Sequence, residues 1–271
     1  MTGPAGRLRV AIAGASGRMG RALIEAVTAS PDLALSGALD VAGGPEVGKD
    51  ATEFLGKKSG VPVSADLRAG LGNADVLIDF TRPEGTLAHL AVCRELGVNA
   101  VVGTTGFSPA QKAEIAGHAE KIAIVMAPNM SVGVNVVMKL LEVAARALDE
   151  SYDIEIVETH HRLKVDAPSG TALALGEAVA RGRGVALGEV RVDGRSGRPG
   201  ERPRGQIGFH SLRGGDVVGE HHVMLIGDRE RIELVHAAQD RALFAEGALR
   251  AARWVAGKPA GSYSMNDVLG L

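Results

Sequence analysis

The sequence predicts an α/β protein of two domains: a doubly wound parallel sheet first, then an α+β domain with a mixed or antiparallel sheet. Three observations support this fold class. Short apolar runs alternate with helical patterns in the first half of the chain. From residue 206 onward, strand-like runs follow one another with no helical pattern between them. The length of 271 residues favours two domains over one.

The first expected strand is Leu8–Ala13, an apolar run that leads into a glycine-rich turn. A helix follows and stops at Ser30-Pro31, where proline cannot continue it. The apolar residues of this helix recur at the spacing of one helix face: Met19, Ala22, Leu23, Ala26 and Val27. Further short apolar runs predict four more strands: 33–39, 76–80, 98–102 and 122–126.

Two helix starts are expected directly after strands. Residues 81–84 (Thr-Arg-Pro-Glu) and 108–111 (Ser-Pro-Ala-Gln) both fit the capping box, with proline in the first turn. Repeated strand–helix units with short connections require parallel pairing and right-handed crossovers. In such a doubly wound sheet, ligands bind beyond the carboxyl ends of the strands.

The pattern changes after residue 130. A long helix is expected over 132–148, a strand over 153–158 and a helix face over 172–179. Because short turns separate the later strand-like runs, these are expected to be antiparallel neighbours: 207–212, 217–226 and 231–236. A last helix is expected over 241–255, and residues 194–205 are expected to form a loop.

Composition excludes several classes of function. The 30 Lys and Arg against 32 Asp and Glu give a formal charge of −2, which argues against nucleic-acid binding. No apolar stretch is long enough to span a membrane, the first residues lack a signal-peptide pattern, and one cysteine fits a reducing compartment, so a cytoplasmic protein is expected. No metal is expected, because His221-His222 lies on a strand and no Cys pair or His-Glu-x-x-His motif supports a site.

A dinucleotide site is predicted at the first strand–helix turn. The turn reads Gly14-Ala15-Ser16-Gly17-Arg18-Met19-Gly20, and its helix start can receive a pyrophosphate. Asp40 ends the next strand, where a carboxylate can accept hydrogen bonds from ribose hydroxyls. Because Val41 brings no positive charge for a 2′-phosphate, NADH is expected to serve at least as well as NADPH. Arg18 weakens that expectation, since it could reach the phosphate.

Two later turns are candidates for contacts to the nicotinamide. Gly103-Thr104-Thr105-Gly106 and Ala127-Pro128-Asn129-Met130 each follow an apolar strand. Their hydroxyl and amide groups can bond a carboxamide or a ribose. Each segment, taken alone, is equally compatible with an ordinary turn.

The densest chemistry lies in residues 158–171. His160, His161, Arg162 and Lys164 place four basic or titratable side chains within five residues, which suits an anionic substrate. Imidazole and lysine ammonium can each present a proton to a substrate. Ser169-Gly170-Thr171 then opens a helix whose free N–H groups can bind a carboxylate. The alternative is a solvated basic turn with Ser169 as a simple helix cap.

Together these motifs resemble the 4-hydroxy-tetrahydrodipicolinate reductase (dihydrodipicolinate reductase) family over nearly the whole chain. The His-His to Ser-Gly-Thr segment is the most specific of them, whereas the glycine loop is common to many oxidoreductases. The segments that carry the resemblance are 14–20, 79–86, 103–107, 131–135, 160–171 and 214–221.

The resemblance implies a Rossmann-like first domain and a cytoplasmic enzyme of lysine and diaminopimelate biosynthesis. It would use NADH or NADPH to reduce 4-hydroxy-tetrahydrodipicolinate, a dicarboxylate, to tetrahydrodipicolinate with loss of water. By motif, His160 matches the acid/base residue and Lys164 the proton donor, while His161, Gly170 and Thr171 match contacts to the substrate carboxylates.

The resemblance also implies domain bounds and an assembly. Residues 1–130 with 241–271 would bind the dinucleotide, and 131–240 would bind substrate and form a homotetramer. Val41 departs from relatives with a basic residue there. Two other functions stay open: an aspartate or amino-acid dehydrogenase, and a nucleotide-sensing regulator without catalysis.

Overall fold

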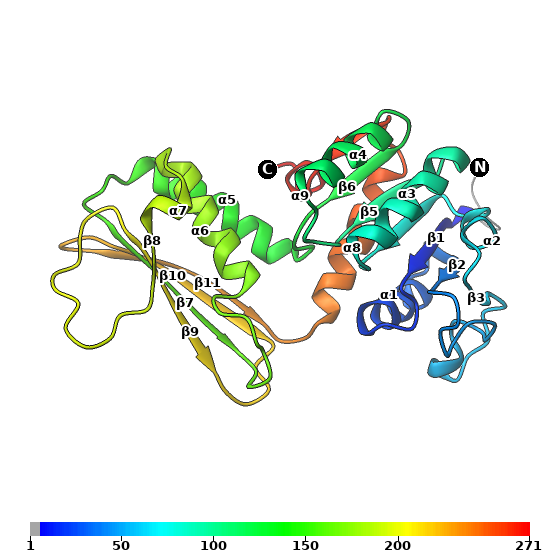
Figure 1. Ribbon diagram of the computed structural model, residues 1–271, viewed down its shortest axis with the longest axis horizontal. Coiled ribbons are helices and arrows are strands. Elements are labelled where there is room, and N and C mark those ends of the chain that lie inside the picture. The colour runs from blue at the N-terminus through cyan, green and yellow to red at the C-terminus, as the bar shows by residue number, and fades with distance from the viewer. Residues whose placement is uncertain (1–5) are drawn as a thin grey trace. The chain divides into compact units, whose positions relative to one another are not determined.

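The computed structural model describes residues 6–271, which form two compact units (Figure 1). Unit 1 contains the chain up to Val132 together with Ala242–Gly270. Unit 2 contains Gly133–Arg241. The chain therefore leaves the first unit, builds the second and returns to complete the first.

Unit 1 is built on a seven-stranded sheet with the order β12-β6-β5-β4-β1-β2-β3, in which every pair is parallel. The order reverses at β1, which lies between β4 and β2 and so marks the topological switch point. This confirms the predicted doubly wound sheet. Its strands are β1 (Leu8–Ala13), β2 (Leu33–Leu39), β3 (Val63–Ser64), β4 (Val76–Asp79), β5 (Asn99–Val102), β6 (Ala123–Met126) and β12 (Gly261–Tyr263).

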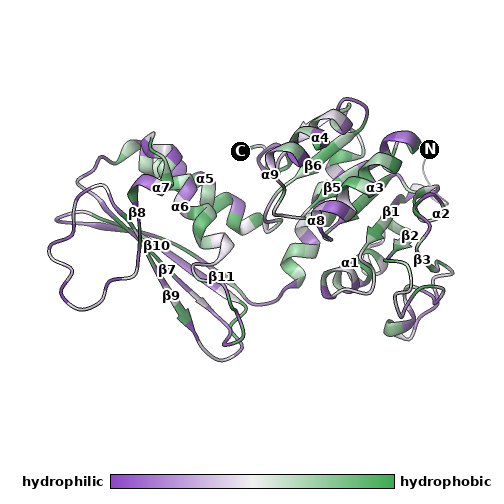
Figure 2. Cartoon of the chain, viewed as in Figure 1, coloured by the Kyte–Doolittle hydropathy of each residue, from purple (hydrophilic) through white to green (hydrophobic). Residues whose placement is uncertain are grey.

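Helices cover both faces of this sheet and give unit 1 two apolar cores. One core lies under α1 (Arg18–Ala29), α8 (Ala242–Val255) and α9 (Met265–Leu269). The other lies under three helices: α2 (Leu67–Leu71), α3 (Pro83–Leu96) and α4 (Pro109–Ala119). Buried on both faces, the strands are almost continuously apolar, as Figure 2 shows for β1, β4 and β5.

The two predicted capping boxes have different outcomes. At α4 the box is present, because the Ser108 hydroxyl accepts from Gln111 N–H while the Gln111 side chain bonds back to the Ser108 N–H. At α3 the prediction is wrong, since Arg82 occupies the N-cap and its side chain makes no capping bond. The Thr81 hydroxyl instead donates to the buried carboxylate of Asp79, at 2.6 Å, and therefore does not cap the helix.

Unit 2 is a five-stranded mixed sheet, β11-β10-β7-β9-β8, packed on helices. Along β7 buried and half-buried residues alternate, which is the mark of a sheet with one covered face. The covered face packs against α5 (Val132–Ala147) and α6 (Gly170–Arg183). The remaining elements are β7 (Asp153–His160), α7 (Leu187–Val190), β8 (Arg191–Asp193), β9 (Ile207–Arg213), β10 (Gly219–Ile226) and β11 (Arg231–Ala238).

The predicted order of neighbours in this sheet needs a correction. Strands β10 and β11 are antiparallel neighbours as expected, but β9 lies beside β7, parallel to it, and not beside β10. Residues 214–218 link β9 to β10 across β7. About five extended residues reach roughly 16 Å, enough to pass one intervening strand at about 10 Å, so a short link does not require a hairpin.

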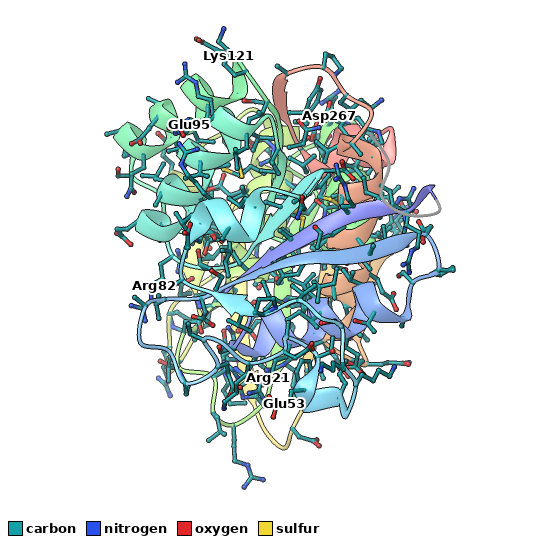
Figure 3. The ribbon with its side chains drawn as sticks, turned by 90° about the vertical axis from the view of Figure 1, so that its right-hand side faces the viewer. Arg21, Glu53, Arg82, Glu95, Lys121 and Asp267 are labelled. Carbon is teal, nitrogen blue, oxygen red and sulfur yellow. The ribbon has the colours of Figure 1, made fainter. Side chains whose placement is uncertain are left out.

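Charged side chains of unit 1 lie on its surface. Figure 3 shows Arg82, Glu95 and Lys121 projecting outward from the α3 and α4 region. Within residues 6–271, no helix is long and apolar enough to cross a membrane.

Candidate active site

The predicted cofactor residues of unit 1 lie at the end of the sheet where the carboxyl ends of its parallel strands meet. The strand register aligns Ala13 with Asp79, Asp79 with Val102, and Val102 with Met126. Each of these residues ends its strand, so the turns that follow leave the sheet at the same level. These turns begin at Gly14, Phe80, Gly103 and Ala127.

The backbone of the glycine loop lies very close to α1. A Cβ at Gly20 would overlap the Gly14 carbonyl, whose carbon lies 2.8 Å from that position. Gly14 itself has φ of +70°, which favours glycine. Gly17 is the N-cap of α1 and provides no side-chain cap, so the first N–H groups of the helix lack that competitor for a phosphate.

Asp40 closes this loop from the neighbouring strand. Its carboxylate accepts hydrogen bonds from the backbone N–H of Ser16, at 2.7 Å, and of Val41, at 2.8 Å. Burial acts to raise the pKa of Asp40, but these bonds lower it below its ordinary value, so the carboxylate is ionised at neutral pH. The Val41 side chain is 73% exposed and brings no charge beside it.

A buried carboxylate organises the next two turns. Asp79 is fully buried and accepts hydrogen bonds from the Thr81 hydroxyl, the Thr104 hydroxyl and His89 Nδ1. Burial acts to raise the pKa of Asp79, but these partners, His89 first, lower it. The Thr104 hydroxyl also accepts from Thr86, so it points into the protein. Among the Gly103–Gly106 candidates, Thr105 and Gly106 are the exposed residues.

The segment 127–130 likewise contains both buried and exposed residues. Ala127 and Met130 are buried in the core shared with α8, whereas Pro128 is exposed. The Asn129 side-chain oxygen accepts from Ser131 N–H, at 2.8 Å, which holds the turn before α5. A cofactor contact from Met130 would therefore involve its backbone rather than its side chain.

In unit 2, the predicted catalytic residues lie where β7 ends. His160 is the last residue of β7, and its buried ring is held by Glu158, whose Oε2 lies 2.5 Å from His160 Nδ1. The other nitrogen, Nε2, faces Gly219 of β10, where a Cβ would stand only 2.9 Å away. Burial lowers the pKa of His160, and the Glu158 carboxylate opposes that effect without cancelling it.

Glu158 is bound by more than one partner. Arg213 of β9 contacts both of its carboxylate oxygens, each at 2.8 Å, and Ser169 N–H donates to Oε1 at 3.2 Å. Burial acts to raise the pKa of Glu158, but Arg213 and the other donors lower it to about 2. The same guanidinium donates to the Asp166 carbonyl at 2.6 Å.

The side chains of Lys164 and His161 in this turn have neighbours of their own. Lys164 Nζ lies 2.8 Å and 2.9 Å from the two carboxylate oxygens of Asp166. His161 Nε2 lies 3.4 Å from Arg241 Nη2, so the Arg241 guanidinium also lies beside the turn. Asp166 is exposed, so an incoming anion could take its place beside Lys164.

The helix start next to this turn has the expected form. Ser169 is the N-cap of α6, and its hydroxyl accepts from Ala172 N–H at 3.1 Å. Gly170 and Thr171 are the first residues of the helix and are exposed and half-buried, respectively. The cap is itself fixed, because Ser169 Oγ lies 3.0 Å from His221 Nε2. Ser169 is thus both a cap and a link to β10.

Three residues of this region, Glu158, Arg213 and His221, were not assigned a role from the sequence. The alternation of side chains between the two faces of β7 could have identified Glu158, because residues 158 and 160 share a face. His221 pairs with Glu158 across β10 and β7, and its ring lies edge-on to His160 at 5.2 Å. Burial lowers the pKa of His221 to about 3, so it is neutral. No local signal identifies Arg213, 55 residues from Glu158.

Metal-ligating and cysteine side chains elsewhere in residues 6–271 do not form a second centre. Among residues 6–271, no group of three His, Cys, Asp or Glu side chains could hold a metal. Cys93 is buried in the core under α3, and burial raises the pKa of its thiol to about 12.

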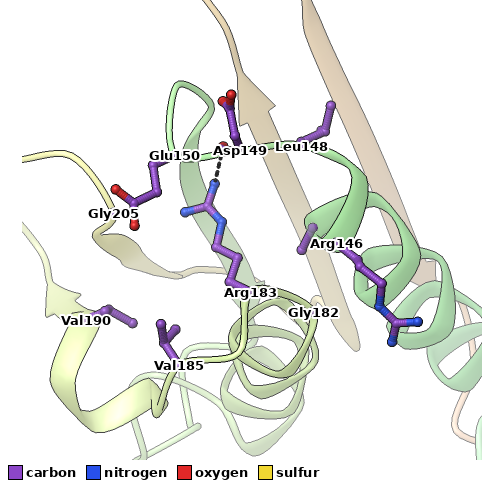
Figure 4. Close-up of a pocket in the computed structure, with 10 residues that line it drawn as sticks. Arg146, Leu148, Asp149, Glu150, Gly182, Arg183, Val185, Val190 and Gly205 are labelled. Carbon is purple, nitrogen blue, oxygen red and sulfur yellow. Dashed lines mark hydrogen bonds between the residues drawn. The ribbon is translucent and has the colours of Figure 1, made fainter.

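A separate hollow of about 250 Å³ lies around Arg183, at the C-terminal end of α6 (Figure 4). Arg183 Nη2 donates to the backbone carbonyls of Tyr152, at 2.6 Å, and Asp149, at 3.4 Å. Because α6 starts at Gly170, about 20 Å of helix separates this hollow from the basic turn. It is therefore not part of the candidate active site.

Comparison with known proteins gives a consistent result over the whole chain. A family model described as dihydrodipicolinate reductase, N-terminus, matches residues 8–130, and one described as dihydrodipicolinate reductase, C-terminus, matches residues 133–269. A Nitrosospira multiformis protein named 4-hydroxy-tetrahydrodipicolinate reductase is 58% identical over 264 residues, which cover 97% of this chain and 98% of that protein.

Solved structures show the same likeness at the level of the fold. A dipicolinate-bound dihydrodipicolinate reductase from Paenisporosarcina sp. TG-14 matches with a TM-score of 0.76 and 27% identity, covering 95% of this chain and 97% of that one. An amine dehydrogenase from Mycobacterium smegmatis matches with a TM-score of 0.58 and 13% identity, covering 97% and 96%. The second likeness extends to the fold alone.

Proposed function

The chain belongs to the dihydrodipicolinate reductase family, and from this premise we propose that it reduces 4-hydroxy-tetrahydrodipicolinate to tetrahydrodipicolinate, with loss of water, using NADH or NADPH. The enzyme is an oxidoreductase of lysine and diaminopimelate biosynthesis. Its ligands would be small molecules only, a dicarboxylate substrate and a nicotinamide cofactor, with no metal.

The observation that carries the proposal is the basic turn beside the start of α6. His160, His161 and Lys164 lie within five residues of one another, and Gly170 and Thr171 open the helix that follows. A dicarboxylate needs two anion-binding positions, and the helix start and the basic turn can supply them. We assign the carboxylate contacts to His161, Gly170 and Thr171.

The chemistry requires a cation at the ring nitrogen. A bound nicotinamide supplies hydride, and its addition to a conjugated imine moves negative charge toward that nitrogen. Lys164 is assigned as the proton donor, because an ammonium both stabilises this charge and can give up a proton. His160 is assigned as the acid/base residue, with Nδ1 bound to Glu158 and Nε2 left to exchange a proton.

The glycine loop is assigned to the cofactor pyrophosphate. Gly17 leaves the start of α1 without a side-chain cap, and Gly20 allows the loop to lie against the helix. Asp40 is assigned to the adenosine ribose. Because Asp40 is ionised and Val41 is uncharged, we propose that NADH is used at least as well as NADPH. The remaining assigned contacts are Gly14, Ala15, Ser16, Arg18, Met19, Gly103, Thr104, Thr105, Ala127, Pro128, Asn129 and Met130.

A coupled assay tests this function. The unstable substrate is generated enzymatically in the presence of NADH or NADPH in parallel reactions, and loss of absorbance of the reduced nicotinamide is followed. We expect turnover with both cofactors. Tight NADH binding without turnover would instead support a nucleotide sensor, and oxidation of an amino acid in a substrate panel would support an amino-acid dehydrogenase.

We also propose that the protein is a cytoplasmic homotetramer assembled through the second sheet. The face of this sheet turned away from α5 and α6 carries exposed apolar side chains, including Leu212 at 53% and Val235 at 47% exposure. Burying such side chains favours association. Light scattering coupled to gel filtration should give about four times the 27.9 kDa mass of the chain.

A further inference from the structure

Glu158 connects the parts of unit 2 that the proposed reaction uses. Its carboxylate is almost fully buried and is held by hydrogen bonds from His160 Nδ1, the Arg213 guanidinium, the Ser211 side chain and the backbone N–H of Ser169. These partners come from the end of β7, from β9 and from the N-cap of α6. Through Arg213, the connection extends to the Asp166 carbonyl in the basic turn.

The bond to His160 determines where that ring carries its proton. An ionised carboxylate only accepts hydrogen bonds, so His160 Nδ1 must be the donor in the contact with Glu158. In the neutral ring, Nε2 then holds the lone pair and is the atom that can take up a second proton. Gly219 leaves room beside that atom, because a Cβ at position 219 would lie 2.9 Å from it.

We propose that Glu158 is a positioning residue for the reduction: it holds His160 as the Nδ1–H tautomer, stabilises the imidazolium, and fixes the start of α6. This inference rests on the proposed function of the same site. Glu158 does not contact the reacting atoms in this role; it acts through His160, Ser169 and Arg213.

The charge balance around His160 explains why one carboxylate has this effect. Burial and the nearby cations disfavour the imidazolium, and Glu158 is the partner that favours it. Removing the negative charge should therefore lower the pKa of His160. The charged and titratable groups that surround the ring are Glu158, Lys164 with its partner Asp166, Arg213, and His221 with His236 behind it.

The same strand provides a matched control. Glu155 is also a carboxylate of β7 bound by arginines and by a histidine: Arg195 at 3.0 Å, Arg202 at 2.9 Å and His210 at 2.7 Å. Residues 155 and 158 point to opposite faces of the strand, so Glu155 lies on the face away from His160. Glu155→Gln removes a similar carboxylate without touching the catalytic side.

The experiment compares the pH dependence of turnover in wild-type enzyme, Glu158→Gln and Glu155→Gln. In Glu158→Gln, the limb of the pH–turnover profile that reports the pKa of His160 should move to lower pH by about one unit or more. An opposite charge in contact shifts a pKa by about that amount. Glu155→Gln should leave the limb in place. Inhibition by dipicolinate should also weaken in Glu158→Gln, while NADH binding should not change.

Coincident limbs for wild type and Glu158→Gln, or an equal shift in Glu155→Gln, would refute the inference. Absence of turnover in the wild type would instead refute the proposed function. A spectroscopic test on the wild type does not depend on the folding of either variant. Nitrogen-15 spectra of labelled histidine, with His160 assigned by its loss in His160→Asn, should show a proton on Nδ1; a proton on Nε2 of the neutral ring would refute the inference.

Discussion

Gly20→Ala should separate the packing of the glycine loop from the chemistry of the enzyme. The added Cβ would overlap the Gly14 carbonyl and lie 2.8 Å from its carbon and 2.9 Å from Ala15 Cα. All of these are backbone atoms, which cannot rotate away as a side chain can. The loop or the first turn of α1 must therefore move, by about an ångström or more, to relieve the overlap with the Gly14 carbonyl oxygen and restore ordinary contact distances near 3.5 Å.

The size of the effect follows from two opposing terms. Overpacking typically lowers the free energy of unfolding by about 1–3 kcal/mol, whereas alanine in place of glycine within a helix raises it by about 1 kcal/mol. The free energy of unfolding should thus fall by no more than about 2 kcal/mol. Cofactor binding should suffer more, because losing one charge-assisted bond to the pyrophosphate costs about 1.5–3 kcal/mol, or roughly 10- to 100-fold in the dissociation constant.

The measurement is an NADH fluorescence titration combined with urea unfolding. Gly117→Ala is the matched control, since Gly117 also lies within a helix, α4, and a Cβ there has no neighbour within 4 Å. The control should bind NADH normally and be slightly more stable. If Gly20→Ala bound NADH as tightly as Gly117→Ala, the close approach at Gly14 would not be what shapes the cofactor site.

Three further outcomes are expected. Lys164→Ala should lower turnover by about 100-fold or more while leaving the NADH dissociation constant unchanged, as steady-state assays and fluorescence titration would show; near-normal turnover would contradict the proton-donor role. Asp40→Ala should weaken NADH more than NADPH in paired titrations, because only NADH has the free 2′-hydroxyl, and equal losses would rule out the ribose contact. The pKa values of Glu155 and Glu158, about 2 in the folded chain against an ordinary 4.5, mean that their stabilising effect is complete above about pH 4.5 and is lost as pH falls toward 2. Urea unfolding across this window should therefore show a smaller loss of stability in Glu155→Gln than in wild type, and parallel curves would contradict the assignment.

The parallel sheet was predictable because its strands are buried on both faces and read as short apolar runs. Strand β12 was not, since Gly261–Tyr263 is short, lies at the sheet edge and has no apolar pattern. The position of β9 was also missed. Local patterns show that a segment is a strand, but its neighbour is decided by packing on the helices of unit 2.

The candidate site was predictable to the extent that its residues are close in the sequence. The run from His160 to Thr171 places cations before a helix start, and motif and spacing both indicate an anionic substrate. The supporting contacts depend on tertiary structure. Glu158 meets Arg213 and Ser169 meets His221 only because β9 and β10 flank β7.

Because the chain returns to unit 1, that unit can be completed only late in translation. Helix α8 contacts β4, β5 and β6, and β12 pairs with β6, although the ribosome makes these late segments after the whole of unit 2. While translation continues, the earlier strands have an uncovered apolar face. The second unit can mature first, and the dinucleotide half becomes complete only after α8 and β12 have been made, so a product that stops before these segments should be prone to aggregate.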